Sequence, residues 1–218
     1  NVAVGYQSLY TNTSGASNTA IGYRALKLND TTNQNTAVGA DALTKNVATN
    51  NTGIGYLALQ ANTSGTLNVA VGALASDACT IGRYNTSLGY SALGTDIDGD
   101  YSTAIGYQAL TTQESDGANT IVGALALDAA VTGDNNTALG YRSLTTNTSG
   151  YNNTGLGKDA LYSNTVGLYN TAVGEGALYT NVDGSNSVAV GRLALYTQDP
   201  ASAVDMHNVA VGYTAAQA

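Results

Sequence analysis

Few residues in this sequence could carry acid–base or nucleophilic chemistry. His207 is the single histidine, and no Gly-x-Ser-x-Gly nucleophile motif occurs. Asp41 and Asp159 occupy equivalent places in a repeat described below but lie seven repeats apart, whereas glycoside hydrolysis needs two carboxyl groups within about 5–10 Å. Glu114 and Asp116 form a closer pair, yet only a weak one. We therefore expect no enzyme and no catalytic residue, with a polysaccharide-degrading enzyme kept as an alternative.

Metal and cofactor motifs are equally sparse. Asp96, Asp98 and Asp100 alternate as in a calcium loop, but Gly99 is fourth rather than sixth and Tyr107 stands where a bidentate glutamate belongs. The pattern favours a solvated acidic turn and leaves calcium open. No Gly-x-Gly-x-x-Gly opens a helix and no Gly-Lys-Ser/Thr occurs. We expect no metal and no cofactor.

Composition excludes several function classes. The chain has 218 residues and a net charge of −8, which argues against nucleic-acid binding through dense cationic contacts. Charged residues make up only 10%, and there are 26 glycines and 15 tyrosines but no Phe or Trp. No apolar run approaches the roughly 18 residues of a spanning helix, so no membrane insertion is expected. Cys79 stands alone and cannot form an intrachain disulfide.

A pentapeptide close to Asn-Thr-Ala-Val-Gly repeats along the whole chain. Its glycine recurs thirteen times, at a spacing of 17 residues with few exceptions. These glycines are Gly5, Gly22, Gly39, Gly55, Gly72, Gly89, Gly106, Gly123, Gly140, Gly157, Gly174, Gly191 and Gly212. We interpret residues 1–218 as a single repeat domain, cut from a longer fibre or adhesin, with an irregular last coil at about 192–218.

Each repeat is read by position relative to this glycine. Asn stands at −4, Thr or Val at −3, a small residue at −2, Val, Ile or Leu at −1, and Leu at +4 in most copies. The alternation over −3 to −1 predicts a short strand. Seventeen residues suit one coil of a parallel β-solenoid, so we predict an all-β fold of about 13 coils. We expect positions −1 and +4 to form the core and the Asn side chains to form a ladder.

The small residues at −2 suggest a contact between chains. We interpret this column as a subunit contact near a symmetry axis, because small side chains allow close packing against another backbone. The alternative is that alanine simply fills a narrow coil. The column includes Ala20, Ala37, Ala70, Ala104, Ala138 and Ala172.

The repeat resembles a known family. Asn186–Gly191, Asn-Ser-Val-Ala-Val-Gly, is similar to the head repeat Asn-Ser-Val-Ala-Ile-Gly of YadA-like trimeric autotransporter adhesins. The longer form Asn-Thr-Ala-Val-Gly-Tyr-x-Ala-Leu resembles repeats of phage tail-fibre-like proteins. The resemblance implies a left-handed β-roll, a side-by-side homotrimer, and a place on a virion or cell surface outside the cell. It implies binding to host-surface proteins or glycans. The adhesin repeat is shorter than this one.

Tyrosine follows the repeat glycine in seven copies, and we expect this column to be partly exposed. Tyr90, Tyr107 and Tyr141 are the candidate surface-binding residues, because a half-exposed ring can stack on a sugar. The alternative is that each ring shields the neighbouring turn. The threonines at −3 raise an ice-binding solenoid as a second functional alternative, although they alternate with valine. The predicted function is a structural and adhesive fibre segment, a rigid spacer with host-surface or glycan binding left open.

Overall fold

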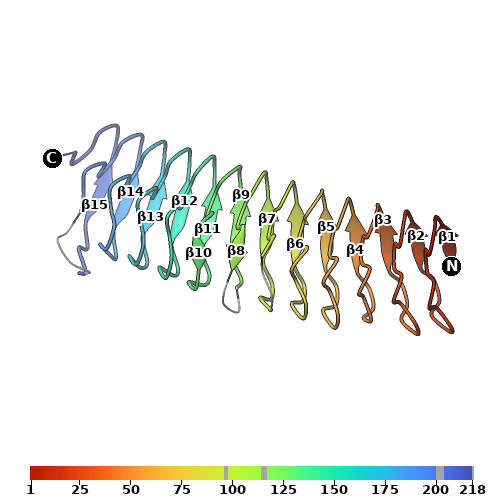
Figure 1. Ribbon diagram of the computed structural model, residues 1–218. Helices are drawn as coiled ribbons and strands as arrows, with labels where there is room; N and C mark the ends of the chain where they lie inside the picture. The colour runs from red at the N-terminus through yellow and green to blue at the C-terminus, as the bar shows by residue number, and fades with distance from the viewer. Residues whose placement is uncertain (96–97, 114–116, 200–203, 218) are drawn as a thin grey trace. The chain divides into compact units, whose positions relative to one another are not determined.

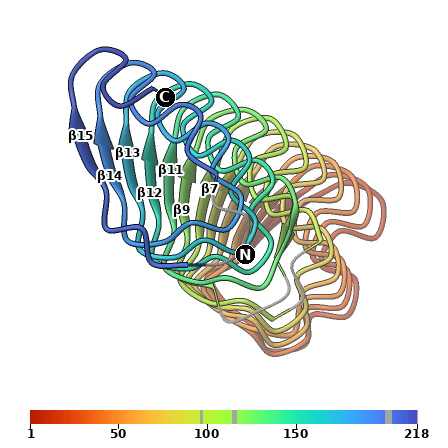
Figure 2. The ribbon, with the colours of Figure 1, turned by 90° about the vertical axis from the view of Figure 1, so that its left-hand side faces the viewer.

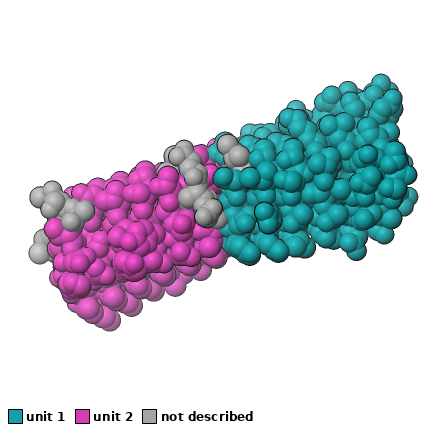
Figure 3. All heavy atoms as spheres, turned by 90° about the horizontal axis from the view of Figure 1, so that it is seen from below, with its two compact units in different colours: residues 1–105 teal, residues 106–218 magenta. Residues whose placement is uncertain are grey.

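The computed structural model describes residues 1–95, 98–113, 117–199 and 204–217, which form two compact units, Asn1–Ile105 and Gly106–Ala218 (Figure 3). All regular elements of the described residues are short strands. Unit 1 contains β1 (Val2–Val4), β2 (Thr19–Ile21), β3 (Thr36–Val38), β4 (Thr52–Ile54), β5 (Val69–Val71), β6 (Thr86–Leu88) and β7 (Thr103–Ile105). Unit 2 contains β8 (Thr112–Gln113), β9 (Thr120–Val122), β10 (Ala130–Val131), β11 (Thr137–Leu139), β12 (Thr154–Leu156), β13 (Thr171–Val173), β14 (Val188–Val190) and β15 (Val209–Val211).

Each unit is a parallel β-solenoid, as the repeat predicts. In unit 1 the strands pair in chain order from β1 to β7, and in unit 2 the order is β9, β11, β12, β13, β14 and β15, with β8 and β10 as a separate pair (Figure 1). Paired residues are equivalent members of successive repeats, such as Ala20 with Ala37. Equivalent positions therefore stack directly, and the coils of a unit nest behind one another (Figure 2).

The repeat glycine ends each strand where only hydrogen fits. Gly55 has φ of +140°, and a Cβ built on it would lie 2.3 Å from the carbonyl oxygen of Gly72 in the next coil. The same close approach recurs in both units, from Gly5 against Gly22 to Gly191 against Gly212. Any side chain at this position would separate neighbouring coils.

The core confirms one predicted column and reverses another. Leucines at +4, such as Leu26 and Leu110, are fully buried. The aliphatic residues at −1, which we expected inside, point outward: Ile21 is 40% exposed and Leu88 is 46% exposed. The inward face of the strand is instead formed by the residues at −2, most of which are small.

The alanine column is therefore no subunit contact. Ala20, Ala37, Ala70, Ala104, Ala138 and Ala172 are all 0% exposed within a single chain. Leucine side chains fill the space beneath them: a Cβ built on Gly53 would lie 3.1 Å from Leu43 Cγ. Small residues fill the narrow interior at this position in every copy except one, where Ile121 is buried, and the alternative reading of this column is correct.

Three turns of each coil use left-handed backbone that the sequence did not reveal. Positions +2, +4 and −5 have positive φ and, apart from Gly176, hold residues other than glycine, as at Arg24 (54°), Leu26 (48°) and Gln34 (60°). Left-handed conformation costs an L-residue roughly 1–2 kcal/mol. Burial of the leucine at +4 offsets that cost, since about 1.5–3 kcal/mol is gained by removing such a side chain from water.

The asparagines at −4 form the predicted ladder. The backbone N–H of Asn35 donates to Asn18 Oδ1 at 2.9 Å, and that of Asn51 donates to Asn35 Oδ1 at 2.9 Å. Asn35 Nδ2 donates to the carbonyl oxygen of Ala48 in the next turn at 2.8 Å. Each amide thus satisfies one donor and one acceptor that a coil leaves open.

A second amide ladder at +7 was missed from the sequence. Its side chains bond directly to one another: Asn62 Nδ2 donates to Asn46 Oδ1 at 2.6 Å, and Asn164 Nδ2 to Asn147 Oδ1 at 2.8 Å. In unit 1 Cys79 takes the next place in this column. The cysteine provides no amide donor for Asn62 Oδ1, which is buried and has no hydrogen-bond partner among the described residues.

The last coil departs from the repeat. β14 and β15 pair across a longer insertion, with Val188 opposite Val209, and Ser185 bridges to Asp205.

The described residues include no helix long and apolar enough to cross a membrane.

The reversed strand faces give a direct stability prediction. Ala37→Leu should destabilise unit 1 by about 1–3 kcal/mol or more, because the added atoms enter a filled interior. Thr36→Leu places the same side chain on the outer face one residue earlier and should change stability by less than about 0.5 kcal/mol. Denaturant unfolding of both variants measures the difference. Equal losses would contradict the assignment of position −2 to the interior.

The interruption of the second amide ladder at Cys79 gives a second stability prediction. Cys79→Asn should raise the melting temperature, because the new amide can donate to Asn62 Oδ1 as Asn62 donates to Asn46. The gain should be about 1 kcal/mol, the net worth of one buried hydrogen bond. Cys79→Ala is the control and should lower stability. An asparagine variant no more stable than the alanine variant would refute this account of the gap.

Candidate interaction surfaces

The outward side of the strands forms a continuous apolar row in each unit. We define the outer strand face as the side chains at positions −3 and −1. Its aliphatic row is Val4, Ile21, Val38, Ile54, Val71, Leu88 and Ile105 in unit 1, and Val122, Leu139, Leu156, Val173, Val190 and Val211 in unit 2. Leu139 and Leu156 are 44% and 39% exposed on neighbouring strands. Contiguous exposed aliphatic surface is typical of a face that binds another molecule.

Threonine runs beside this aliphatic row. In unit 2 the strands β9, β11, β12 and β13 present Thr120, Thr137, Thr154 and Thr171 in consecutive register. All four side chains are at least partly exposed. On these four strands the outer strand face therefore alternates a hydroxyl and an aliphatic group, and repeats them at the ~4.8 Å spacing of paired strands.

The predicted tyrosine column is exposed, as expected. Tyr90, Tyr107 and Tyr141 are 48%, 52% and 44% exposed. Tyr90 belongs to unit 1 and the other two to unit 2, where Ala124 takes the place between them. Tyr107 and Tyr141 thus lie two coils apart, so no unbroken stripe of rings runs along unit 2.

Neighbouring groups cover some of these rings. Arg142 Cζ lies 5.1 Å from the ring centroid of Tyr141, and in unit 1 Tyr6 stacks on Tyr23 at 5.7 Å. A sugar stacking on Tyr141 would have to displace the guanidinium from that face. The contacts support the alternative in which these rings pack against their own repeat.

A further set of stacked tyrosines was not singled out from the sequence. Tyr162, Tyr179 and Tyr196 stand five residues after successive repeat glycines and stack at 4.9 Å between centroids. Burial raises the pKa of the Tyr179 phenol, and the two flanking phenols raise it further. Tyr84 and Tyr101, five residues before their glycines, stack at 4.9 Å in unit 1. The signal was available, because aromatic residues at one repeat position must meet on adjacent coils.

The carboxylates singled out from the sequence are held in ion pairs. Asp41 accepts two hydrogen bonds from Arg24, at 2.7 and 2.9 Å, and Asp159 accepts one from Arg142 at 2.8 Å. These pairs join neighbouring coils within unit 1 and within unit 2. Each aspartate faces an arginine rather than a second carboxylate, which is the arrangement of a structural ion pair and not of a glycosidase pair.

The carboxyl group of one further acid, Asp77, has a shifted pKa. Partial burial raises the pKa of its carboxyl group. The equivalent places on the two adjacent coils hold Gln60 and Gly94, so its own column places no second carboxylate on a neighbouring coil. A raised pKa alone does not make a catalytic acid.

The remaining candidates do not converge. Asp96 of the calcium-loop candidate and the pair Glu114 and Asp116 lie outside the described residues. Asp98 is exposed, and Asp100 accepts a hydrogen bond from the backbone N–H of Arg83 at 2.6 Å. The described residues contain no cluster of three or more metal-ligating side chains.

His207 has a structural place in the repeat. It is exposed and occupies position −5, with φ of 48°, where other coils use Asn, Ser, Gln, Tyr, Leu or Ala. Asn, Asp and His are the non-glycine residues that most often adopt this conformation. The histidine therefore fits a turn that favours its side chain.

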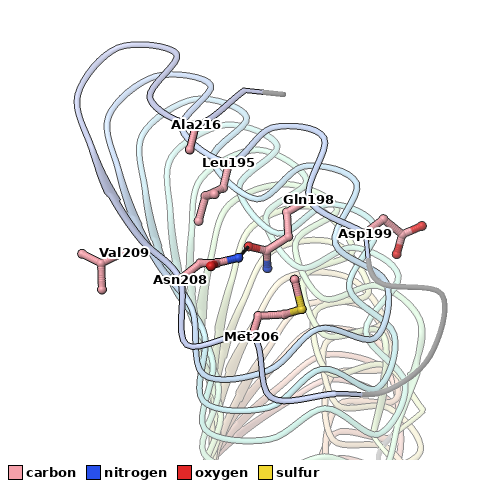
Figure 4. Close-up of a pocket in the computed structure, with 7 residues that line it drawn as sticks. All are labelled: Leu195, Gln198, Asp199, Met206, Asn208, Val209 and Ala216. Carbon is pink, nitrogen blue, oxygen red and sulfur yellow. Dashed lines mark hydrogen bonds between the residues drawn. The ribbon is translucent and has the colours of Figure 1, made fainter.

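A hollow of about 330 Å³ opens at the last coil (Figure 4). Leu195, Val209 and Ala216 give it apolar walls, and Gln198 Oε1 accepts a hydrogen bond from Asn208 Nδ2 at 2.8 Å. Leu195 and Ala216 occupy the core position +4, Gln198 and Asn208 occupy the two ladder positions, and Val209 belongs to the outer strand face at the rim of the hollow. The hollow is the open interior of a coil rather than a shaped ligand site.

Comparison with protein-family models, curated proteins and solved structures found no match.

Proposed function

We propose that this chain is a structural and adhesive segment of a trimeric surface fibre, as in phage tail fibres and bacterial adhesins. The observation that carries the proposal is the outer strand face. Each unit presents a row of aliphatic side chains on its sheet, with Ile54 37% and Leu88 46% exposed in the single chain. Three chains packed side by side around an axis would bury this row.

The rest of the repeat suits a rigid spacer. Backbone hydrogen bonds join adjacent coils outside the strands as well, as from Leu26 N–H to the carbonyl of Ala42 at 3.1 Å. Two amide ladders provide hydrogen-bond partners for buried polar groups of the turns, with Asn62 Oδ1 as the exception. Such a coil has few exposed backbone groups for a protease to engage, and three parallel chains would multiply any weak surface contact.

The resemblance to YadA-like heads and tail-fibre repeats supports an extracellular place on a virion or cell surface. Its partners would be two further copies of the chain and a host-surface glycan or protein. The exposed tyrosines Tyr90, Tyr107 and Tyr141 remain the candidate glycan contacts, at the flank of the repeat rather than on the outer strand face.

Ice binding is a second candidate, and one observation favours it. Threonine at −3 and the aliphatic residue at −1 both face outward, so the strand face offers a regular array of methyl and hydroxyl groups. This function requires that face to be free in solution. It is therefore incompatible with a trimer that buries the same side chains.

The assembly prediction separates these two functions. Light scattering should give about three times the chain mass of 22.0 kDa. Ile54→Asp should shift the chain to monomers, because a charge would lie in the apolar contact. Tyr56→Asp introduces the same charge two residues away, off the outer strand face, and should leave the trimer intact. A stable monomer at micromolar concentration, with thermal hysteresis in freezing assays, would replace the fibre proposal with ice binding.

Glycan binding requires its own measurement. The intact trimer should bind densely glycan-coated surfaces far better than free sugar, because each shallow site is weak and three chains act together. Tyr107→Ala should reduce retention, whereas Thr154→Ala, on the outer strand face, should not. Absence of binding at every sugar density would leave the segment a passive spacer.

A further inference from the structure

Two tyrosines in unit 1 form an exposed, parallel ring pair on adjacent coils. The centroids of Tyr84 and Tyr101 lie 4.9 Å apart, with 4° between the ring planes. The side chains are not shielded: Tyr84 is 46% exposed and Tyr101 is 63% exposed. Their phenol rings therefore meet in a place that a dissolved oxidant can reach.

The backbone holds both rings in the same orientation. Tyr84 and Tyr101 have φ of 59° and 60°, and each backbone N–H donates to a carbonyl of the preceding coil, Thr66 and Arg83. A left-handed conformation is unfavourable for an aromatic residue, and most other coils use Asn, Ser, Gln or another non-aromatic residue at this position. Ring stacking contributes part of the compensation. Two equivalent turns thus present the rings at the same place on adjacent coils.

We propose that Tyr84 and Tyr101 form an oxidative modification site, which a peroxide-driven oxidant converts to an intrachain dityrosine that joins neighbouring coils. The inference goes beyond the proposed function, since it needs only adjacent coils of one chain. Failure of the trimer test leaves it unaffected.

The chemistry balances with hydrogen peroxide and a haem peroxidase as oxidant. Each phenol loses one electron and one proton and becomes a phenoxyl radical. The two radicals join through a carbon–carbon bond between ring carbons ortho to the oxygens. Those carbons then release their hydrogens as protons while the two oxygens regain protons, which restores both phenols. One peroxide takes up the two electrons and two protons and leaves as two water molecules.

Pre-arrangement decides which tyrosines couple. Two radicals held on adjacent coils react as one molecule, whereas isolated tyrosines must meet by diffusion between chains. Tyr10 and Tyr56 are as exposed, at 66% and 56%, but have no ring contact with another tyrosine among the described residues. If exposure alone decided the reaction, Tyr10 and Tyr56 would couple as often as the stacked pair. If stacking decides it, Tyr84 and Tyr101 couple with each other.

The test is oxidation of the full chain at low concentration by a haem peroxidase and limiting hydrogen peroxide. Electrophoresis under denaturing conditions separates intrachain from interchain products, and peptide mass spectrometry locates the bond through the loss of two hydrogens. We expect intrachain dityrosine fluorescence, with Tyr84 joined to Tyr101.

The matched variants are Tyr101→Phe and Tyr56→Phe, which keep a ring and remove only the phenol. The first should lower the intrachain yield at Tyr84 at least about five-fold, and the second should leave it unchanged. Circular dichroism establishes that both retain the fold. Intrachain coupling of Tyr10 or Tyr56 as often as of the pair, or an unchanged yield at Tyr84 in Tyr101→Phe, would overturn the proposal.

Discussion

The close approach of one coil's glycine to the carbonyl of the next is the constraint on which the other contacts of the repeat depend. At Gly39 a Cβ would lie 2.4 Å from the oxygen of Gly55, so the coils can stack at strand spacing only while this position has no side chain. Stacking at that spacing places like residues directly above one another. The amide ladders, the stacked tyrosines and the arginine–aspartate pairs all follow from this register, because each joins equivalent or nearly equivalent positions of neighbouring repeats.

The period of the glycines was enough to predict a parallel β-solenoid, its strand positions and its first asparagine ladder. Side-chain size did not predict which face of the strand points into the core. Val, Ile and Leu at −1 look like core residues, but the interior beneath the strand is already occupied by the leucine at +4. That leucine reaches inward from a left-handed turn, as at Leu43 with φ of 50°, a conformation that no local sequence rule assigns to leucine. Once it fills the coil, the position opposite holds alanine, glycine or serine in every copy except one, where Ile121 is buried.

For the candidate surfaces, too, the sequence predicted one property, exposure, and not another, the side-chain contacts. Tyr90, Tyr107 and Tyr141 were recognised as exposed because Lys158, Glu175 and Arg192 replace tyrosine at that position in other coils. Their ring contacts were not predictable, since these depend on which residue stands on the adjacent coil and on how the turn directs it. The second amide ladder was overlooked because it lies within the polar stretch of the repeat, where Asn is also a common turn residue.

The outer strand face is the part of the repeat that the fold of one chain does not explain. An outward strand position needs β-propensity, which threonine supplies equally well at −3, yet −1 is aliphatic in all thirteen copies. Leu88, Leu139 and Leu156 are not β-branched, so backbone preference does not account for them either. Other outward positions vary freely: +1 holds Tyr, Ala, Lys, Glu and Arg. A position that stays apolar while exposed, beside positions that become charged, is best explained by a molecule that covers it, and a second and third copy of the same repeat would match its spacing coil by coil.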